Sequence, residues 1–141
     1  MTSTTRWLII GGLALAAVLG IAYWGATTTG FGTCANHELS SADAPNRQWR
    51  VVVFKRDCGE AMDVTTQVVI LPRGENLGNR SGGIFVIAFD HGAGRAPWVE
   101  ATWVSPDSLL IRFDDQAKLF HRTPKSGTIV VQYVGVRRAA A

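Results

Sequence analysis

Residues Trp98-Val-Glu-Ala-Thr-Trp-Val-Ser-Pro-Asp-Ser-Leu-Leu-Ile-Arg-Phe113 indicate a β fold, because they combine two strand patterns and a turn. Apolar and polar side chains alternate from Val99 to Trp103, which is typical of a strand with one buried face. A turn is expected at 105–108, where a proline fixes φ and Ser and Asp side chains can bind nearby backbone amides. The apolar run 109–113 predicts a second strand, so the stretch indicates two consecutive strands of a sheet.

The same signals recur on both sides of this stretch. Short runs of β-branched and aromatic residues alternate with segments rich in Gly, Pro, Asn and Asp, and none shows the period of about 3.6 residues of an amphipathic helix. We therefore expect an all-β domain of about seven strands, arranged as a small antiparallel sandwich or barrel. Besides 98–104 and 109–113, the predicted strands are Gln48–Lys55, Thr65–Leu71, Gly83–Phe89, Lys118–Arg122 and Thr128–Val136.

An uncharged segment of 20 residues, Trp7 to Ala26, precedes this domain. A helix of that length is about 30 Å long, which matches the hydrocarbon core of a bilayer. Arg6 lies before the segment and the first charged residue after it is Glu38, so the positive-inside rule places the N-terminus in the cytoplasm. The segment predicts one N-terminal transmembrane helix in a bacterial inner membrane, with the β-domain in the periplasm or extracytoplasmic space.

The expected organisation is a cytoplasmic N-terminus at 1–6, a transmembrane anchor at 7–26, a linker at 27–33, an extracytoplasmic β-domain at 34–136 and a tail at 137–141. The competing interpretation is a signal peptide, cleaved at the small-residue pattern Gly20-Ile21-Ala22. The apolar run is longer than the core of a usual signal peptide, and the Tyr and Trp that follow the pattern are a poor cleavage context. Retention as a signal-anchor is therefore the favoured interpretation.

Gly12, Ala16 and Gly20 recur every four residues, so they share one face of the predicted helix. Small residues at this spacing let two transmembrane helices approach closely, which makes the three a candidate helix–helix contact in a homodimer. The alternative is that Gly and Ala are simply common in bacterial export sequences.

The charge balance argues against nucleic-acid binding. The formal net charge of the chain is +3, and after Arg6 there are 13 basic and 11 acidic residues. Arg137 and Arg138 near the C-terminus account for that excess, so the predicted domain itself has equal numbers of basic and acidic residues. A nucleic-acid-binding surface needs a basic stripe and an anionic-lipid site needs a polybasic patch. Neither is visible, so nucleic acid is not an expected partner.

Cys34 and Cys58 are the two cysteines of the chain. In an oxidising extracytoplasmic compartment the pair predicts a disulfide, which would add about 3–4 kcal/mol in the chain-entropy model. The alternative is a reactive thiolate at Cys58, whose pKa Arg56 could lower, but no histidine or other base stands at a diagnostic spacing. Zinc needs three or four ligands with paired spacing, so we expect no metal site and no cofactor.

Two motifs resemble a group of small bacterial proteins, exported or membrane-anchored, to which no activity is assigned. Arg56-Asp57-Cys58-Gly59 follows an apolar strand, and Trp103-Val-Ser-Pro-Asp107 follows Pro97-Trp98-Val99-Glu100. The resemblance covers roughly Glu38 to Tyr133 on motif order, and it implies a small β-domain rather than an activity. Glu60-Ala61-Met62-Asp63 departs from the small Ala-Thr-Thr-like segment expected there in the group.

The motif Trp-x-Ser-Pro-Asp followed by an apolar strand is also similar to blades of TolB-like β-propellers. A propeller needs about four or more blades of roughly 40 residues each. This chain is too short to hold them, so the similarity implies shared turn chemistry.

Arg95, Trp98 and Trp103 are the candidate contacts with a ligand or partner. Trp98 and Trp103 are five residues apart and face opposite sides of a strand, so we expect one in the core and the other free to stack on a ligand or partner. Arg95 lies in a loop with two glycines, and with Arg73 and Arg80 it could line an anion-binding rim. The alternative is that these arginines are simply solvated.

No residue is assigned a catalytic role. Asp90 and His91 are adjacent at the end of a predicted strand and could act as a pair, but an ordinary turn is the favoured interpretation. His121 lies in an apolar run and is expected to pack within a strand. The sequence has no Gly-x-Ser-x-Gly motif and no phosphate-binding P-loop.

These observations predict a non-enzymatic module that binds another envelope protein or serves a structural role, with a homodimer as one form of partner. The alternative from another class is a small-ligand or anion sensor that uses the loop from Arg95 to Trp98. A hydrolase that uses Asp90 and His91 is the third and least favoured hypothesis.

Overall fold

The computed structural model describes residues 3–28, 34–59, 62–90 and 94–138. The chain divides into two compact units, Met1–Thr33 and Cys34–Ala141. The described part of the first unit is helix α1 (Ser3–Thr28), and the described part of the second holds nine strands. The first unit contains the apolar segment 7–26, and the second contains residues 34–136 of the predicted β-domain.

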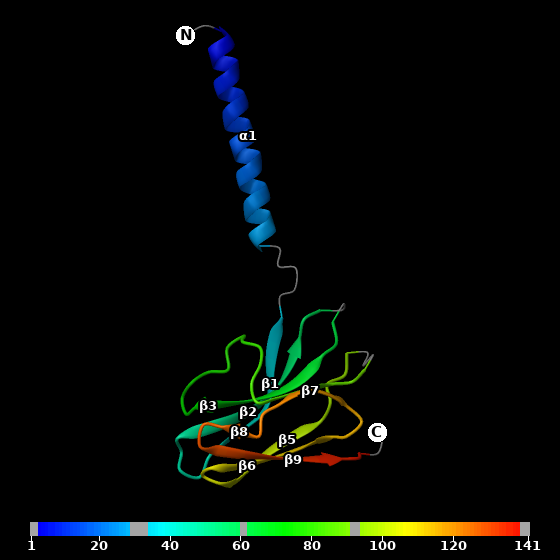
Figure 1. Ribbon diagram of the computed structural model, residues 1–141. Helices are drawn as coiled ribbons and strands as arrows, with labels where there is room; N and C mark the ends of the chain where they lie inside the picture. The colour runs from blue at the N-terminus through cyan, green and yellow to red at the C-terminus, as the bar shows by residue number, and fades with distance from the viewer. Residues whose placement is uncertain (1–2, 29–33, 60–61, 91–93, 139–141) are drawn as a thin grey trace. The chain divides into compact units, whose positions relative to one another are not determined.

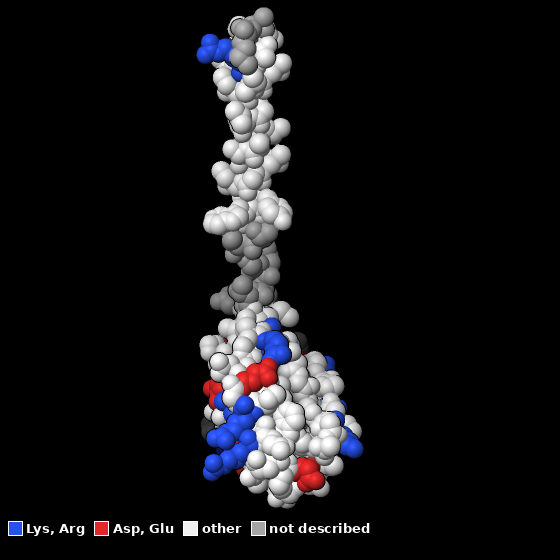
Figure 2. All heavy atoms as spheres, turned by 90° about the vertical axis from the view of Figure 1, so that its left-hand side faces the viewer, with Lys and Arg blue, Asp and Glu red and all other residues white. Residues whose placement is uncertain are grey.

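Helix α1 is apolar on every side. Its segment Ser3–Trp24 has 22 residues with a mean hydropathy of 2.0, and all of these side chains are exposed. On the face shown in Figure 2, charged side chains appear on the helix only near its N-terminal end. A surface helix of a soluble protein would have a polar side. By length and composition α1 can cross a membrane, and it fits a single-pass anchor or a signal sequence.

The observed helix is longer than the predicted span. It begins at Ser3 rather than Trp7 and ends at Thr28, so the first two residues of the predicted linker are helical. Gly12 and Gly20 have open space beside them. The helix–helix contact through these glycines and Ala16 stays a prediction.

The β-domain is a sandwich of two sheets, which Figure 1 shows as two layers. Sheet A has the strand order β1-β2-β3-β4-β7, and sheet B has the order β5-β6-β9-β8. Paired strands are antiparallel except β6 and β9, which are parallel. The strands are β1 Ala35–Asp43, β2 Trp49–Asp57, β3 Thr65–Pro72, β4 Phe85–Ala88, β5 Val99–Ser105, β6 Ser108–Asp114, β7 Lys118–Arg122, β8 Lys125–Ser126 and β9 Ile129–Val136.

The prediction of an all-β sandwich after one apolar helix is confirmed, and the seven predicted strands are present, β7 with the predicted bounds and the other six with slightly shifted ones. Two strands are missing from the prediction: β1, which is mostly polar, and β8, which has two residues and lies in a predicted turn. The expectation of purely antiparallel pairing is wrong for β6 and β9. After β6 the chain crosses to sheet A, adds β7 there and returns to sheet B, so β9 enters in the direction of β6.

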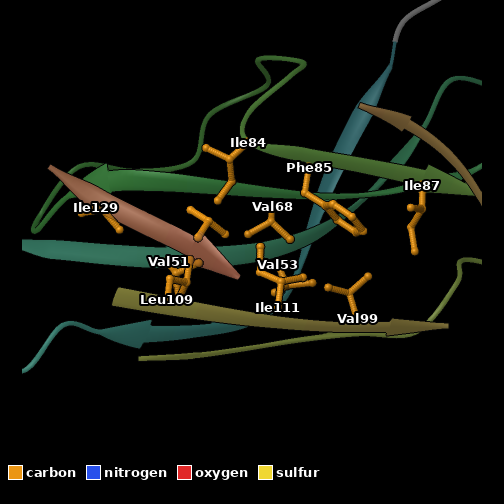
Figure 3. Packing of buried hydrophobic residues seen from close by; sticks show 11 residues of the cluster. Val51, Val53, Val68, Ile84, Phe85, Ile87, Val99, Leu109, Ile111 and Ile129 are labelled. Carbon is orange, nitrogen blue, oxygen red and sulfur yellow. The ribbon is translucent and has the colours of Figure 1, made fainter. Parts of the chain in front are cut away.

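The main core lies between the sheets, and Figure 3 shows side chains of both layers pointing toward each other. Phe85 and Ile87 of β4 face Leu109 and Ile111 of β6, and all four are 0% exposed. On each strand the two residues are two positions apart, so their side chains point to the same face of the sheet. Burial of this apolar surface is the main favourable term in folding the domain. The whole cluster consists of Val51, Val53, Val68, Ile84, Phe85, Ile87, Val99, Leu109, Ile111, Ile129 and Val131.

Two side-chain hydrogen bonds fasten β5 and the segment before it to sheet A. The indole N–H of Trp103 donates to the carbonyl oxygen of Ala42 on β1 at 2.9 Å. The hydroxyl of Thr66 on β3, which is fully buried, donates to the carbonyl oxygen of Pro97 at 2.6 Å. Both bonds satisfy polar groups that would otherwise be unpaired near the interior. They therefore fix the position of β5 relative to β1.

Tyr133 of β9 makes a third connection between the sheets. Its hydroxyl lies 2.5 Å from the carbonyl oxygen of Thr123 and 3.1 Å from that of Ile84. Its ring stacks on Phe85 with 5.3 Å between centroids. Burial raises the pKa of the phenol above its usual 10.0, while the hydrogen bond to Thr123 and the charge of Arg122 lower it. The net shift is upward, so the fold favours the neutral hydroxyl.

Replacing Tyr133 with phenylalanine is expected to lower the free energy of unfolding at neutral pH by about 1–2 kcal/mol, because the half-buried carbonyl oxygen of Thr123 loses the hydroxyl that donates to it. The free energy of unfolding of the wild type is also expected to fall as Tyr133 ionises at high pH. Because folding raises the phenol pKa, this contribution is complete below pH 10.0 and is lost as the pH rises through the folded-state pKa. Urea unfolding from about pH 7 to about pH 11 should show this loss in the wild type alone. Parallel pH profiles of the two proteins would contradict the assignment.

A second, smaller apolar cluster lies on the outer face of sheet A, under residues 73–83, which we call the strap. Leu77 of the strap packs against Val52, Phe54 and Leu71. Val52 and Phe54 are 0% exposed although they point away from the main core. Strand β2 is therefore covered on both faces, as its continuous apolar run predicts.

Two arginines of β2 hold the strap on either side of this cluster. Arg50 Nη2 donates to the carbonyl oxygen of Glu75 at 3.0 Å, and Arg56 Nη1 donates to that of Asn79 at 3.1 Å. The strap ends at Gly83, whose φ is +144° and where an added Cβ would lie 2.2 Å from a backbone oxygen of β3. Only glycine allows this close approach, so Gly83 lets the end of the strap lie directly against β3.

The predicted disulfide between Cys34 and Cys58 is present, with the Cα atoms 3.9 Å apart. Cys34 directly precedes β1 and Cys58 directly follows β2, so the bond closes the open end of this antiparallel pair. The side-chain amide of Asn79 donates to the carbonyl oxygen of Cys34 at 2.6 Å, which ties the strap to the same end. Both sulfur atoms are bonded, so the alternative of a free thiolate at Cys58 does not hold in this structure.

Candidate binding groove between two open sheet edges

A groove of about 600 Å³ lies where the two sheets open at one edge of the sandwich. One wall is β1, at the edge of sheet A, and the other is β5, at the edge of sheet B, with the segment before it. Among the described residues, β1 pairs only with β2 and β5 only with β6. The lining consists of residues 39–42, Val51, Val53 and residues 96–101. The groove is therefore flanked by two free strand edges.

Strand β1 is largely exposed, except near its start, where the backbone N–H of Asn36 donates to Oδ1 of Asn79 in the strap at 3.2 Å. Seven of its nine residues are exposed and the other two are half-buried. The register shifts between Glu38 and Ser40, so Leu39 forms a bulge without a partner in β2 and is 54% exposed. An edge strand offers unpaired backbone N–H and C=O groups to another extended chain, and a bulge limits such pairing to segments that fit it. The side of β1 that faces away from β2 is therefore only partly bonded within the described residues.

The groove is hollow because small side chains face it. Ser40 and Ala42 lie directly opposite two core valines of β2, so they point to the same side of the sheet as the core. Ala96 and Ala101 belong to the opposite wall. The centre of the sandwich is filled by Phe, Ile and Leu, whereas Ser and Ala at this edge leave the space between the sheets open.

The walls of the groove are held in place before anything binds. The bond from Trp103 to Ala42 fixes β1 to β5, and the bond from Thr66 to Pro97 fixes the segment before β5 to sheet A. Ala42 and Pro97 both line the groove. A preformed site loses less conformational entropy on binding than one that must first assemble.

The two edge strands carry acidic residues and neither contains Lys or Arg. Glu38 and Asp43 lie on β1, and Glu100 lies on β5 and lines the groove. Asp43 is 3.7 Å from Arg73 and Glu100 is 3.8 Å from Arg112, in pairs whose side chains are about half exposed. Arg138 also lies 4.6 Å from the ring centroid of Trp98, so basic side chains from other elements balance the acidic residues at this rim.

The structure separates the three predicted contact residues. Trp98 lines the groove and is half-buried, with Arg138 and Arg112 lying 4.6 Å and 5.9 Å from its ring centroid. Trp103 packs against the core and uses its N–H in the bond to β1. Arg95 does not line the groove and lies 5.1 Å from the centroid of the Phe89 ring. Contact of these residues with a ligand or partner stays a prediction.

The arginines predicted to form an anion-binding rim have separate partners. Arg73 pairs with Asp43 at 3.7 Å, and Arg80 pairs with Glu75 at 2.8 Å. With Arg95 over an aromatic ring, each cation has its own local contact. The described contacts therefore give no rim shared by the three residues.

The predicted Asp–His pair cannot be placed, because His91 lies outside the described residues while Asp90 is exposed. His121 lies in strand β7, but the expectation that it is packed there is wrong, because all five residues of β7, at the edge of sheet A opposite β1, are exposed. A ring nitrogen of His121 lies 3.0 Å from the hydroxyl of Thr123. Within the described ranges, no group of three His, Cys, Asp or Glu residues could hold a metal ion.

A smaller cavity of about 310 Å³ lies between the strap and the outer face of sheet A. Phe54, Leu71 and Leu77 contribute apolar side chains to its lining. Glu75 and Arg80, which form an ion pair 2.8 Å apart, also line it. The cavity can accommodate a small molecule with an apolar part and a polar end.

The sequence patterns do not predict the groove, because they do not predict strand β1, which forms one of its walls. The segment Ala35–Asp43 is mostly polar and lacks the alternation that marks a half-buried strand. The predicted disulfide does indicate this strand, because a bond from Cys34 to Cys58 brings the residues after Cys34 next to the end of β2.

No protein-family model, curated protein or solved structure matches this chain. The resemblances to small exported β-domain proteins and to propeller blades therefore stay predictions, and the function is inferred from the groove itself.

Proposed function

We propose that this chain is a single-pass membrane protein whose β-domain lies outside the cytoplasm and binds an extended segment of another envelope protein, without catalysing a reaction. The apolar helix supports the anchor, and Arg6 before it supports a cytoplasmic N-terminus. The disulfide supports an oxidising compartment. The proposed location is a bacterial inner membrane with the domain in the periplasm.

The groove between β1 and β5 is the single observation that carries the binding function. Its two free strand edges, preformed walls and volume of about 600 Å³ match the way extended peptides add to a sheet edge. In that mode backbone hydrogen bonds supply affinity, and pockets for alternate side chains supply specificity. The exposed strand β1 supports the backbone hydrogen bonds, and the hollow beside Ser40 and Ala42 supports a pocket for a side chain.

The location is tested by labelling intact cells with a membrane-impermeant thiol reagent, before and after reduction. Cys34 and Cys58 should be labelled only after reduction, because they are outside and bonded to each other. Labelling that requires cell lysis would place the domain in the cytoplasm and overturn the proposed topology.

The binding function is tested by placing a photo-crosslinking amino acid at Leu39, which lines the groove and is 54% exposed. Irradiated cells should yield one adduct of defined size, and the crosslinked peptide should map to one extended segment of its protein. The same amino acid at Val130, which is 47% exposed on the outer face of sheet B, serves as the control.

The adduct from Leu39 should disappear when Ser40→Trp fills the groove and should persist with Thr102→Trp, an exposed position of β5 outside the lining. An equal adduct from Val130, or an adduct that survives the filled groove, would show that the groove is not the binding site.

The strap cavity favours a second candidate, the binding of a small molecule with an anionic end near Arg80. Thermal-shift measurements with sugars, peptides and organic anions should then raise Tm, and Arg80→Gln should remove the response to anions. Arg95→Gln is the matched control, because Arg95 lies outside this cavity. A flat response to the whole panel would argue against a sensor.

A further inference from the structure

The two ends of the strap are held by β3, the strand that it follows. Near the first end the backbone N–H of Glu75 donates to the carbonyl oxygen of Pro72 at 3.0 Å. Near the second end the backbone N–H of Gly82 donates to Oε1 of Gln67 at 2.9 Å. Pro72 and Gln67 both belong to β3, so these bonds do not depend on β1 or on the disulfide.

The tip of the strap, residues 78–80, is bonded to the two strand ends that the disulfide joins. The side-chain amide of Asn36 on β1 donates to the carbonyl oxygens on either side of Asn79, at 3.4 and 2.7 Å, and its backbone N–H donates to Oδ1 of Asn79 at 3.2 Å. Arg56 Nη1 on β2 donates to the carbonyl oxygen of Asn79 at 3.1 Å. Asn79 donates in turn to the carbonyl oxygen of Cys34 at 2.6 Å. We call these bonds the latch.

The latch depends on the position of the first residues of β1. Asn36 lies two residues after Cys34, Arg56 lies two residues before Cys58, and the two stand opposite each other in the β1–β2 register. Hydrogen bonds that are open to water stabilise little by themselves, and the last pairs of an edge strand open easily. The disulfide keeps this end of β1 beside β2, so it keeps the partners of the strap tip in place.

The middle of the strap covers apolar side chains on the outer face of sheet A. Leu77 packs against Val52, Phe54 and Leu71, and the first two of these are 0% exposed. The cavity of about 310 Å³ also has Leu77 in its lining. This cluster is separate from the core between the sheets, so the strap can lift from it without disturbing that core.

We infer that the disulfide between Cys34 and Cys58 holds the strap closed, and that its reduction by a dithiol opens the outer face of sheet A while the two-sheet core stays folded. The ends of the strap remain on β3, so only its middle moves and exposes Phe54 with the cavity beside it. The groove between β1 and β5 is a separate site, because it lies beside residues 39–42 of β1.

The chemical step is thiol–disulfide exchange. A thiolate of the dithiol attacks one sulfur of the bond and forms a mixed disulfide, which the second thiolate of the reductant then breaks. The dithiol gives up two electrons and two protons and closes its own disulfide, and Cys34 and Cys58 become thiols. Both cysteines are only partly buried, so the bond is within reach of a reductant.

Limited digestion with trypsin, on the full chain in nanodiscs, tests whether the strap opens. One sample is oxidised, and the other is reduced with dithiothreitol and alkylated before digestion. The side chain of Arg80 is already 69% exposed, whereas its carbonyl oxygen accepts a latch bond from Asn36, so cleavage between Arg80 and Ser81 requires the tip to leave β1. Reduction should speed this cleavage about tenfold or more, as measured by mass spectrometry of the fragments.

The bond between Arg112 and Phe113 is the internal control for global unfolding. It lies within β6, which is paired on both sides in sheet B, so it should stay uncut in the reduced protein. The double change Cys34→Ser and Cys58→Ser should give the Arg80 cleavage rate of the reduced wild type without any reductant.

Asn79→Ala separates the latch from the covalent bond. With the disulfide intact, this change removes the bonds that the Asn79 side chain makes to Cys34 and Asn36, so cleavage after Arg80 should already be fast. Reduction should then add less than about a twofold increase. Asn46→Ala is the matched control, because Asn46 lies in the turn at the other end of the β1–β2 pair and should leave both rates unchanged.

Each contrary result removes a different step. Equal cleavage after Arg80 before and after reduction would mean that the strap stays closed without the disulfide. Parallel gains at Arg80 and Arg112 would mean that reduction unfolds the whole domain. An oxidised Asn79→Ala variant that is cut as slowly as wild type, or that still responds fully to reduction, would mean that the disulfide does not act through the latch.

Discussion

Replacing Phe85 with alanine is expected to lower the free energy of unfolding of the β-domain by about 3–5 kcal/mol. The side chain is 0% exposed. Its ring centroid is 5.1 Å from that of Phe113 on β6 and 5.3 Å from that of Tyr133 on β9, so it joins sheet A to two strands of sheet B. The change removes apolar burial and leaves a cavity that two hydrogen-bonded sheets cannot close completely.

Denaturant unfolding of the full chain in a mild detergent, followed by the circular dichroism of the strands, measures this loss. Phe120→Ala is the matched control, because Phe120 lies on β7 and is 57% exposed. The control should change the free energy of unfolding by no more than about 0.5 kcal/mol. Similar losses for the two variants would mean that the sandwich is not organised around Phe85.

Removing the disulfide with the double change Cys34→Ser and Cys58→Ser is expected to cost about 3–4 kcal/mol. The bond spans 24 positions in the sequence, so its loss releases a loop of that size in the unfolded chain. It also frees the open end of the β1–β2 pair, where Ala35 lies opposite Asp57. Edge strand β1 should therefore lose protection against hydrogen exchange more than β2, which is paired on both sides.

Reduction of the wild type by dithiothreitol should reproduce the loss, and the double variant should not respond to the reductant. A difference in stability below about 1 kcal/mol would show that the strap and β2 hold β1 without the covalent bond. Uniform loss of hydrogen-exchange protection across sheet A would contradict the specific effect on β1.

The strands that sequence predicts are those whose patterns follow directly from packing. Alternation in β5 reflects one face on the core and one in solvent, and the burial of β5 alternates in the same way. The continuous apolar run of β2 reflects two covered faces, one by the core and one by the strap. Each pattern is local, so no knowledge of distant residues is required.

The features that sequence misses depend on distant contacts. β1 is polar because its inner face borders the open groove, and its membership in sheet A follows from pairing with β2 and from the disulfide. The parallel pair of β6 and β9 arises from a crossover through sheet A. Periodicity within a segment does not report which neighbour a strand will take.

Of the three contact residues predicted from the sequence, only Trp98 lines the candidate groove. Trp98 lines the groove, whereas Trp103, with the same composition signal, packs on the core and bonds to Ala42. The opposite directions of two residues five apart on a strand predict that they differ, but the pattern alone does not tell which of them lies inward. The residues that hollow the groove, Ser40 and Ala42, have no distinguishing chemistry in the sequence.

The position of the disulfide has a mechanical consequence for a domain on a tether. Any pull from the N-terminal side enters through Cys34, directly before β1, and a bare edge strand would peel from β2 one residue pair at a time. The bond to Cys58 joins this end of β1 covalently to the end of β2, which is paired on both sides, so two strands share a force applied at Cys34. Strand β1 can thus leave one of its edges unpaired in sheet A without being the only strand that carries a load applied at Cys34.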